Sequence, residues 1–106
     1  MKVTVEFEIE TPDGMSNISK KIDLDFLPAA ETYIHIMRHP LGHGNLELWF
    51  HGQAEKVGIN LDQLEDGKPT GYIELSINDA GPFVHPSHWE KTKQALLQEG
   101  WQITSE

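Results

Sequence analysis

The sequence predicts an α+β protein in which a single antiparallel sheet of about five strands carries a C-terminal α-helix on one face. Three observations predict this fold: alternation of apolar and polar residues in several segments, turn-forming residues between the first two segments, and a helical pattern near the C-terminus. A chain of 106 residues can bury about two-thirds of its surface. It shows no internal repeat or linker, so we expect a single domain over residues 1–106.

The N-terminal segment predicts a β-hairpin. Residues 2–10 alternate strictly and turn one apolar face inward, formed by Val3, Val5, Phe7 and Ile9. Residues 11–14 read Thr-Pro-Asp-Gly, which favours a turn. In the second strand we expect Ile18, Ile22, Leu24 and Phe26 to point inward. We expect cross-strand partners whose numbers sum to 27, because that register places Glu6 opposite Lys21 and avoids like charges face to face.

The middle of the chain is less regular. Residues 29–38 fit a helical stripe or a strand, and their β-branched and aromatic residues favour the strand. Two further strands are expected at residues 45–51 and 71–78. Their inward side chains are Leu46, Leu48, Phe50, Ile73, Leu75 and Ile77. Residues 53–69 are polar and punctuated by glycine and proline, so we expect a loop with one helical turn near residues 61–64.

The end of the chain predicts a helix over residues 87–99. Ser87 and Glu90 have the spacing of a capping box, in which each side chain bonds the other residue's backbone amide. Gly100 fits the left-handed position that ends helices, and Trp101 fits the hydrophobic contact that accompanies this closure.

Composition limits the classes of function. Asp and Glu number 17 against 8 Lys and Arg, a net charge of −9, which disfavours direct contact with nucleic-acid phosphates and suits a basic protein partner. The absence of cysteine excludes disulfides, thiol nucleophiles and Cys-ligated zinc. We find neither a signal peptide nor an apolar run long enough for a bilayer, and we expect a cytoplasmic protein without membrane contact.

A second face of the predicted sheet is rich in aromatic residues and histidine. It has two interpretations: a minor core under the helix or the 53–69 loop, or an exposed surface of the composition found at protein-binding hot spots. On the second interpretation the partner-binding residues are Glu8, Glu10, Tyr33, His35, Glu47, Trp49, His51, Tyr72 and Glu74.

The six histidines raise a metal hypothesis. Its ligands would come from His39, His43, His85 and His88, but Pro40 and Gly42 break the helical spacing of the first two. No HExxH, Walker, GxGxxG or GxSxG motif is present. Ser87 lies beside two histidines, yet the expected cap accounts for it. We therefore favour no metal, no cofactor and no enzymatic activity.

The leading hypothesis is a small acidic interaction module, such as an inhibitor or immunity-type protein, that binds a basic protein through an acidic and aromatic sheet face. One alternative is a His-based metal-binding protein or metal-dependent hydrolase. The other is a homodimeric structural or phage-type accessory protein that pairs through the same face.

Overall fold

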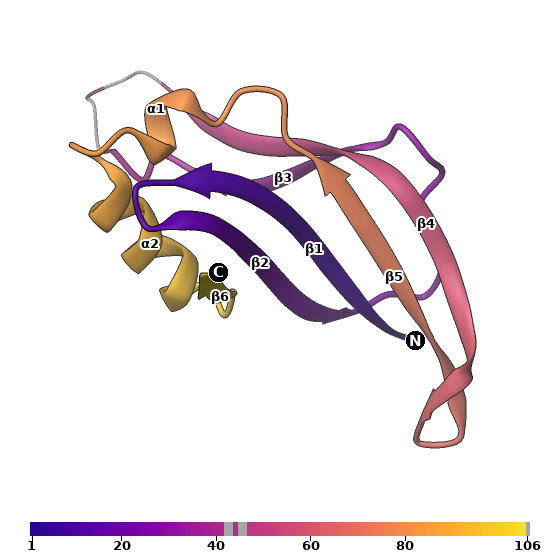
Figure 1. Cartoon of the computed structure of the whole chain (residues 1–106). Coiled ribbons are helices and arrows are strands. Elements are labelled where there is room, and N and C mark those ends of the chain that lie inside the picture. Colours follow the sequence, from indigo (N-terminus) through magenta and orange to yellow (C-terminus); the bar gives the residue numbers. More distant parts are fainter. Residues whose placement is uncertain (42–43, 45–46, 106) are drawn as a thin grey trace.

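The computed structural model describes residues 1–41, 44 and 47–105, which form a six-stranded mixed sheet with two short helices (Figure 1). The strands run in the order β3-β4-β5-β1-β2-β6. In chain order the elements are β1 (Lys2–Thr11), β2 (Gly14–Asp23), β3 (Tyr33–Arg38), β4 (Trp49–Glu65), β5 (Lys68–Ser76), α1 (Gly81–Val84), α2 (Trp89–Gln98) and β6 (Gln102–Ser105). The α+β class and the strand at residues 29–38 are confirmed, since β3 lies within that segment.

The expectation of a wholly antiparallel sheet is wrong, and the sheet has six strands where about five were expected. The sheet joins two units, the β1–β2 hairpin and the β3–β4–β5 meander, and they meet where β1 and β5 pair in parallel. The segment after β2 carries the chain to the far edge of the sheet, so that the meander returns inward and places β5 beside β1. A sixth strand, β6, follows the helix and pairs with β2.

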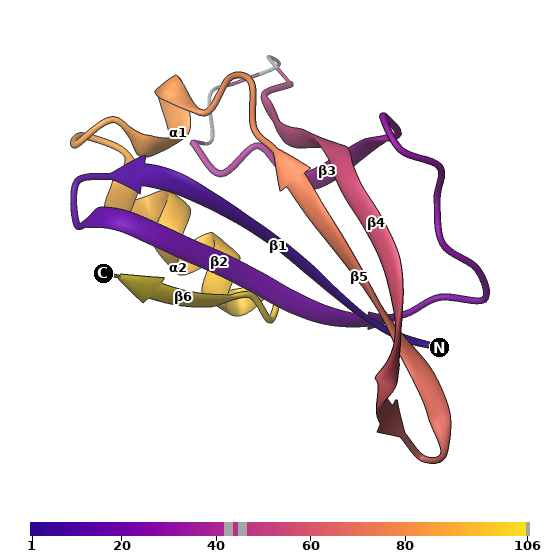
Figure 2. The same ribbon diagram turned by 45° about the vertical axis from the view of Figure 1, so that its right-hand side comes forward.

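The expected loop at residues 53–69 is instead a long β-hairpin. The strands β4 and β5 join at a two-residue turn in which Asp66 has φ 55° and Gly67 has φ 76°. Positive φ at both central residues is the geometry that Asp-Gly favours in tight hairpins. Irregularities at Ala54/Lys56 and Asn60/Leu64 interrupt the pairing and mask the alternation in the sequence. Both views show this hairpin extending away from the rest of the sheet (Figures 1 and 2).

The expected register of the first hairpin is also wrong, although its faces are right. Partners sum to 25, so Val3 faces Ile22 and Glu6 faces Ser19. Because the observed sum differs from 27 by two, the paired side chains of the two strands keep their expected faces. The inward placement of Phe26 is wrong, since β2 ends at Asp23 and Phe26 is 80% exposed. Lys2 lies opposite Asp23 and its Nζ is 2.6 Å from the Asp23 carboxylate, which lowers the pKa of Asp23 chiefly through that hydrogen bond.

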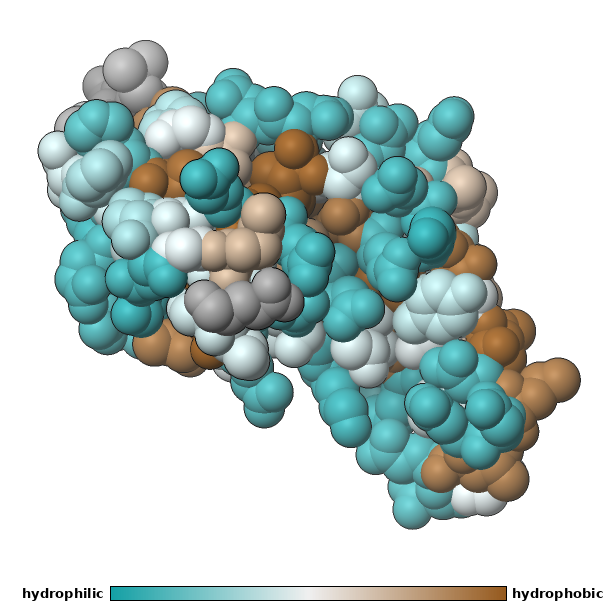
Figure 3. Space-filling model, in the orientation of Figure 1, coloured by the Kyte–Doolittle hydropathy of each residue, from teal (hydrophilic) through white to brown (hydrophobic). Residues whose placement is uncertain are grey.

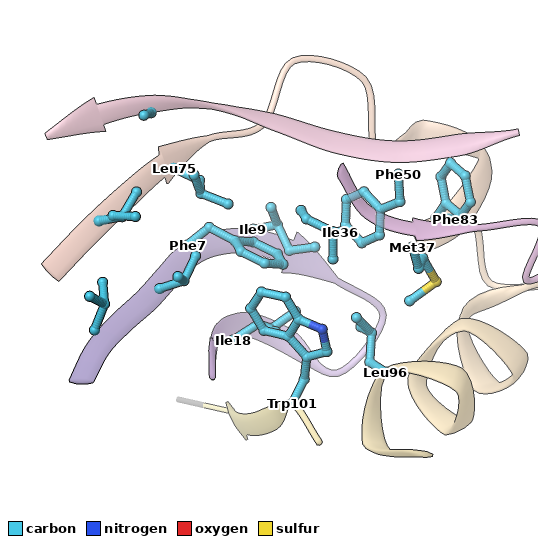
Figure 4. Close-up of a cluster of buried hydrophobic side chains, with 14 of the residues drawn as sticks. Phe7, Ile9, Ile18, Ile36, Met37, Phe50, Leu75, Phe83, Leu96 and Trp101 are labelled. Atoms are coloured by element: carbon cyan, nitrogen blue, oxygen red, sulfur yellow. The ribbon is translucent and has the colours of Figure 1, made fainter. Parts of the chain in front are cut away.

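The core lies between the inward face of the sheet and α2 (Figure 4). Phe50 is fully buried; its ring stacks on Phe83 at a centroid distance of 5.0 Å and meets Phe7 edge-on at 5.7 Å. Leu96 from α2 and Trp101 beyond it point into the same cluster. The prediction of a C-terminal helix on one face of the sheet is therefore confirmed.

The predictions for the two ends of α2 have different outcomes. At the C-terminus, the Trp101 amide donates to the Leu96 carbonyl at 3.0 Å and the Gly100 amide to Leu97 at 3.1 Å, with Gly100 at φ 93°, as the sequence predicts. At the N-terminus the prediction of a capping box is wrong. His88 is the N-cap residue and makes no side-chain cap bond, while the Ser87 amide donates to His85 Nδ1 at 3.1 Å.

A polar contact ties α2 to the turn of the first hairpin. Trp89 Nε1 donates to the Asp13 carboxylate at 2.9 Å, and Lys93 Nζ lies 3.1 Å from the same oxygen. The hydrogen bond from Trp89 and then that from Lys93 lower the pKa of Asp13. Within the described ranges, no helix is long and apolar enough to cross a membrane.

Candidate functional site

The face of the sheet opposite α2, here called the outer face, carries the polar half of each strand. Cross-strand pairing places Thr4 beside Tyr72 and Glu6 beside Glu74 on this face, while their neighbours Val5 and Ile73 are buried in the core. The interpretation of this face as a minor core under the helix or the 53–69 loop is wrong. The helix covers the aliphatic face, and residues 53–69 form strands of the sheet itself.

A groove opens on the outer face where β1 and β5 separate. Their parallel pairing runs only from Val3–Gly71 to Glu6–Glu74, and beyond it the two strands diverge (Figure 2). The cavity between them has a volume of about 510 Å³. Its lining residues are Glu6, Phe7, Glu8, Asn17, Glu55, Glu74, Leu75, Ser76 and Ile77. We call it the acidic groove, after its carboxylates Glu6, Glu8, Glu55 and Glu74.

The acidic groove is mainly polar, with negative walls. Phe7 and Leu75 line it between the strands, but both belong to the core and are only 3% and 6% exposed. Within the described residues, one ion pair reaches these carboxylates: Lys56 Nζ lies 3.8 Å from Glu74 Oε2. Carboxylates gathered from three strands around one cavity can bind a cationic group.

A second feature of the outer face is a cluster of rings at the β3 edge, here called the aromatic–histidine cluster: Tyr33, His35, Trp49 and His51. His35 and Trp49 meet edge-on with centroids 4.3 Å apart, and Tyr33 lies 5.9 Å from His51. Tyr33 is 62% exposed and Trp49 37% exposed. The Nδ1 atom of His51 is buried without a hydrogen-bond partner.

Pairing between β3 and β4 explains why these rings meet. His35 lies directly opposite His51, and Arg38 opposite Trp49, on either side of a bulge that turns both Ile36 and Met37 inward. Strict alternation through residues 33–38 would place Met37 on the same face as Tyr33 and His35, but the bulge turns it into the core. The Arg38 guanidinium carbon lies 5.1 Å from the Trp49 ring centroid, within the range of a cation–π contact.

The structure divides the predicted partner-binding residues among several places. Glu8 and Glu74 line the acidic groove, and Tyr33, His35, Trp49 and His51 form the aromatic–histidine cluster. Glu47 borders the cluster, 3.8 Å from Arg38 and from His39.

The other two predicted residues lie outside both features. Tyr72 packs over Gly58, where its ring would come within 2.5 Å of an added Cβ atom. Glu10 lies opposite Met15 near the hairpin turn.

Sequence reasoning missed two of the four groove carboxylates, Glu6 and Glu55. Glu6 shares the parity of Glu8 along β1, but the expected register paired it with Lys21, whereas it faces Ser19 and Glu74. Glu55 belongs to the 53–69 segment that was expected to be a loop, so it was not assigned to a sheet face. The Asp66-Gly67 dipeptide was the signal that could have revealed the hairpin and so placed Glu55 on a strand.

The histidines of the metal alternative do not gather in the described structure. His85 and His88 lie near the start of α2 with ring centroids 5.9 Å apart, and His39 lies beside Glu47. His43, like Leu46 of the predicted strand, lies outside the described residues. Within the residues that are described, no three or more His, Cys, Asp or Glu side chains are grouped so that they could hold a metal ion.

Comparison of the chain with protein-family models, with curated proteins and with solved structures finds no match. The outer face is therefore the feature from which a function can be inferred.

Proposed function

We propose that this protein is a non-enzymatic interaction module that binds a basic protein through its outer face, as an inhibitor or immunity-type protein would. The observation that carries the proposal is the acidic groove, where four carboxylates from three strands surround one cavity. An Arg or Lys side chain matches this arrangement, because its charged head can reach more than one carboxylate at once.

The aromatic–histidine cluster supplies the second half of the proposed interface. Exposed Tyr and Trp side chains give large apolar contact area at low entropy cost, and they dominate the binding energy of many interfaces. Tyr33 and Trp49 have this character. The groove would select a basic partner and accelerate its approach, whereas the cluster would slow its dissociation.

The experiment compares two charge-reversal variants of equal net charge. E8K/E55K changes two exposed groove residues, and E90K/E99K changes two exposed residues of α2. Each variant moves the net charge of the chain from −9 to −5, since each substitution adds two units. Matched thermal unfolding curves establish that both variants fold.

Immobilised wild type and both variants are exposed to a lysate of the source cells at moderate salt. We expect wild type and E90K/E99K to retain a basic protein that E8K/E55K does not retain. With the purified partner, E8K/E55K should slow association about tenfold or more at low salt and change dissociation less. Equal retention by the two variants would show that net charge alone governs capture and would overturn the proposal.

A further inference from the structure

Two histidines of the aromatic–histidine cluster face each other across neighbouring strands. His35 of β3 lies directly opposite His51 of β4 in the antiparallel pairing, and their ring centroids are 6.1 Å apart. His35 is exposed and His51 is half-buried, so solvent reaches the pair. The edge of the sheet that carries them is mixed in character, with hydrophilic and hydrophobic side chains exposed on the molecular surface (Figure 3). The paired backbones hold the two rings close together, as in other directly opposed pairs of an antiparallel sheet.

We propose that His35 and His51 form a binding site for a divalent transition-metal ion, with Cu²⁺ and Ni²⁺ as the ions that fit it best. The site uses two rings of the cluster, but it involves no protein partner and does not depend on the proposed function. Neutral imidazole is the commonest metal ligand among side chains, and it suits copper, nickel and zinc. Two imidazoles do not fill a coordination sphere, so water completes it on the exposed side of the pair.

The distance between the rings favours this class of ion. A metal–nitrogen bond of about 2.0–2.1 Å places each ring centroid about 3.2 Å from the ion, so two rings on one ion have centroids about 4.5–6.4 Å apart. The observed 6.1 Å lies near the upper limit, where the two nitrogens are almost on opposite sides of the ion. Such a wide angle is typical of the square-planar and tetragonal sites of Cu²⁺ and Ni²⁺, whereas Zn²⁺ prefers a tetrahedron.

The surroundings of His51 decide which nitrogen binds and how tightly. Its Nδ1 atom is buried without a hydrogen-bond partner, so Nε2 is the ring nitrogen that reaches the ion. A metal-bound histidine usually donates its second N–H to an acceptor, and loss of that acceptor typically weakens metal binding by about 10–100-fold. We therefore expect a dissociation constant of about 1–100 µM.

The charges around the pair permit a bound cation. Arg38 brings a positive charge to the cluster, but Glu47 Oε1 lies 3.8 Å from Arg38 Nη1 and offsets it. The net charge of −9 attracts cations to the molecule as a whole.

A second pair of histidines has nearly the same separation and serves as a comparison. His85 and His88 have ring centroids 5.9 Å apart. However, His85 Nδ1 accepts a hydrogen bond from the Ser87 amide at 3.1 Å, and His88 is the N-cap residue of α2, where the positive end of the helix dipole disfavours a cation. The metal should therefore bind the pair on the sheet and not the pair at the helix.

The test is a calorimetric titration of the protein, without an affinity tag, at about pH 7.5, where an unperturbed imidazole is neutral. The probes are Cu²⁺ and Ni²⁺, with Mg²⁺ as a cation that prefers carboxylates. We expect one Cu²⁺ per chain, weaker binding of Ni²⁺ and no dependence of Mg²⁺ binding on the histidines. H35Q and H51Q should each raise the dissociation constant for Cu²⁺ by about tenfold or more, because each removes one of two ligands.

The matched control is H85Q/H88Q, which should bind Cu²⁺ like the wild type. Thermal unfolding curves establish that all variants fold, and His35 is exposed, so H35Q alone suffices if H51Q does not fold. Wild-type binding weaker than about 100 µM, an unchanged constant in H35Q, or loss of binding in H85Q/H88Q would overturn the proposal.

Trp49 provides a second, independent readout of where the ion binds. Its ring centroid lies 4.3 Å from that of His35, and its side chain is more exposed than the buried Trp89 and Trp101. Because Cu²⁺ quenches the fluorescence of an indole close to it, bound Cu²⁺ should quench Trp49, and W49F should lose most of the quenching. An ion at His88 would instead quench its chain neighbour Trp89, so equal quenching in W49F and wild type would contradict the site on the sheet.

Discussion

The two ends of the sheet differ in how they are held. At the α2 end, Leu96 and Trp101 close over fully buried residues such as Phe50, and Asp13 bonds Trp89 across the turn of the first hairpin. At the other end the tip of the β4–β5 hairpin, residues 59–70 and here called the arm, exposes Leu61 and Leu64 to solvent. The buried contacts that stabilise the molecule are therefore concentrated at the α2 end.

The sharpest test of this contrast is Phe50→Ala. The substitution removes a fully buried ring that contacts Phe7 and Phe83, so it leaves a cavity between the sheet and α1. We expect the free energy of unfolding to fall by about 3–5 kcal/mol, measured by denaturant unfolding at low protein concentration. A loss below about 1 kcal/mol would mean that this end of the molecule is not the stable one.

A smaller effect is expected at the closure of α2. Gly100 has φ 93°, and the nearest atom to an added Cβ is Lys20 Cε at 3.7 Å, so Gly100→Ala introduces backbone strain without a clash. The expected loss is about 1–2 kcal/mol. Gly81→Ala is the control, because its φ is not in the left-handed region and the space around it is open; it should change stability by less than about 0.5 kcal/mol. Equal losses of stability in the two variants would show that the positive φ of Gly100 is not the cause of the loss.

Local patterns in the sequence predict the α2 end well. The alternation of residues 2–10 identifies β1 and its buried face, and Gly100 with Trp101 identifies the closure of the helix. Each of these features depends on residues that are close together in the chain, where periodicity and helix-end chemistry act directly.

The arrangement of the sheet could not be predicted in the same way. The parallel contact of β1 with β5 joins residues about seventy positions apart, and no local pattern specifies which strands become neighbours. The acidic groove exists only because those two strands pair briefly and then separate, so Glu6 and Glu55 could not be assigned to one site with Glu8 and Glu74. By contrast, the aromatic–histidine cluster depends on adjacent strands of one meander, and its four members were predicted together.

The contact between Asp13 and α2 predicts a pH dependence of stability. Its hydrogen bonds lower the pKa of Asp13 in the folded state, so the carboxylate stabilises the fold above the unfolded value of about 3.9. This contribution is lost as the pH falls through the lower folded pKa. In Asp13→Asn the acid-side loss of stability should be shallower than in the wild type, measured by unfolding between about pH 6 and pH 2. Asp62→Asn, on the arm, should follow the wild type, and identical curves for D13N and wild type would contradict the assignment.

The smallest effect is expected on the arm. L61S/L64S replaces two side chains that are 77% and 60% exposed, so little buried apolar area is lost within one chain. Its free energy of unfolding, measured with denaturant, should lie within about 0.5 kcal/mol per substitution of the wild type. A larger loss would show that these leucines support the fold, and the contrast between the two ends would fail.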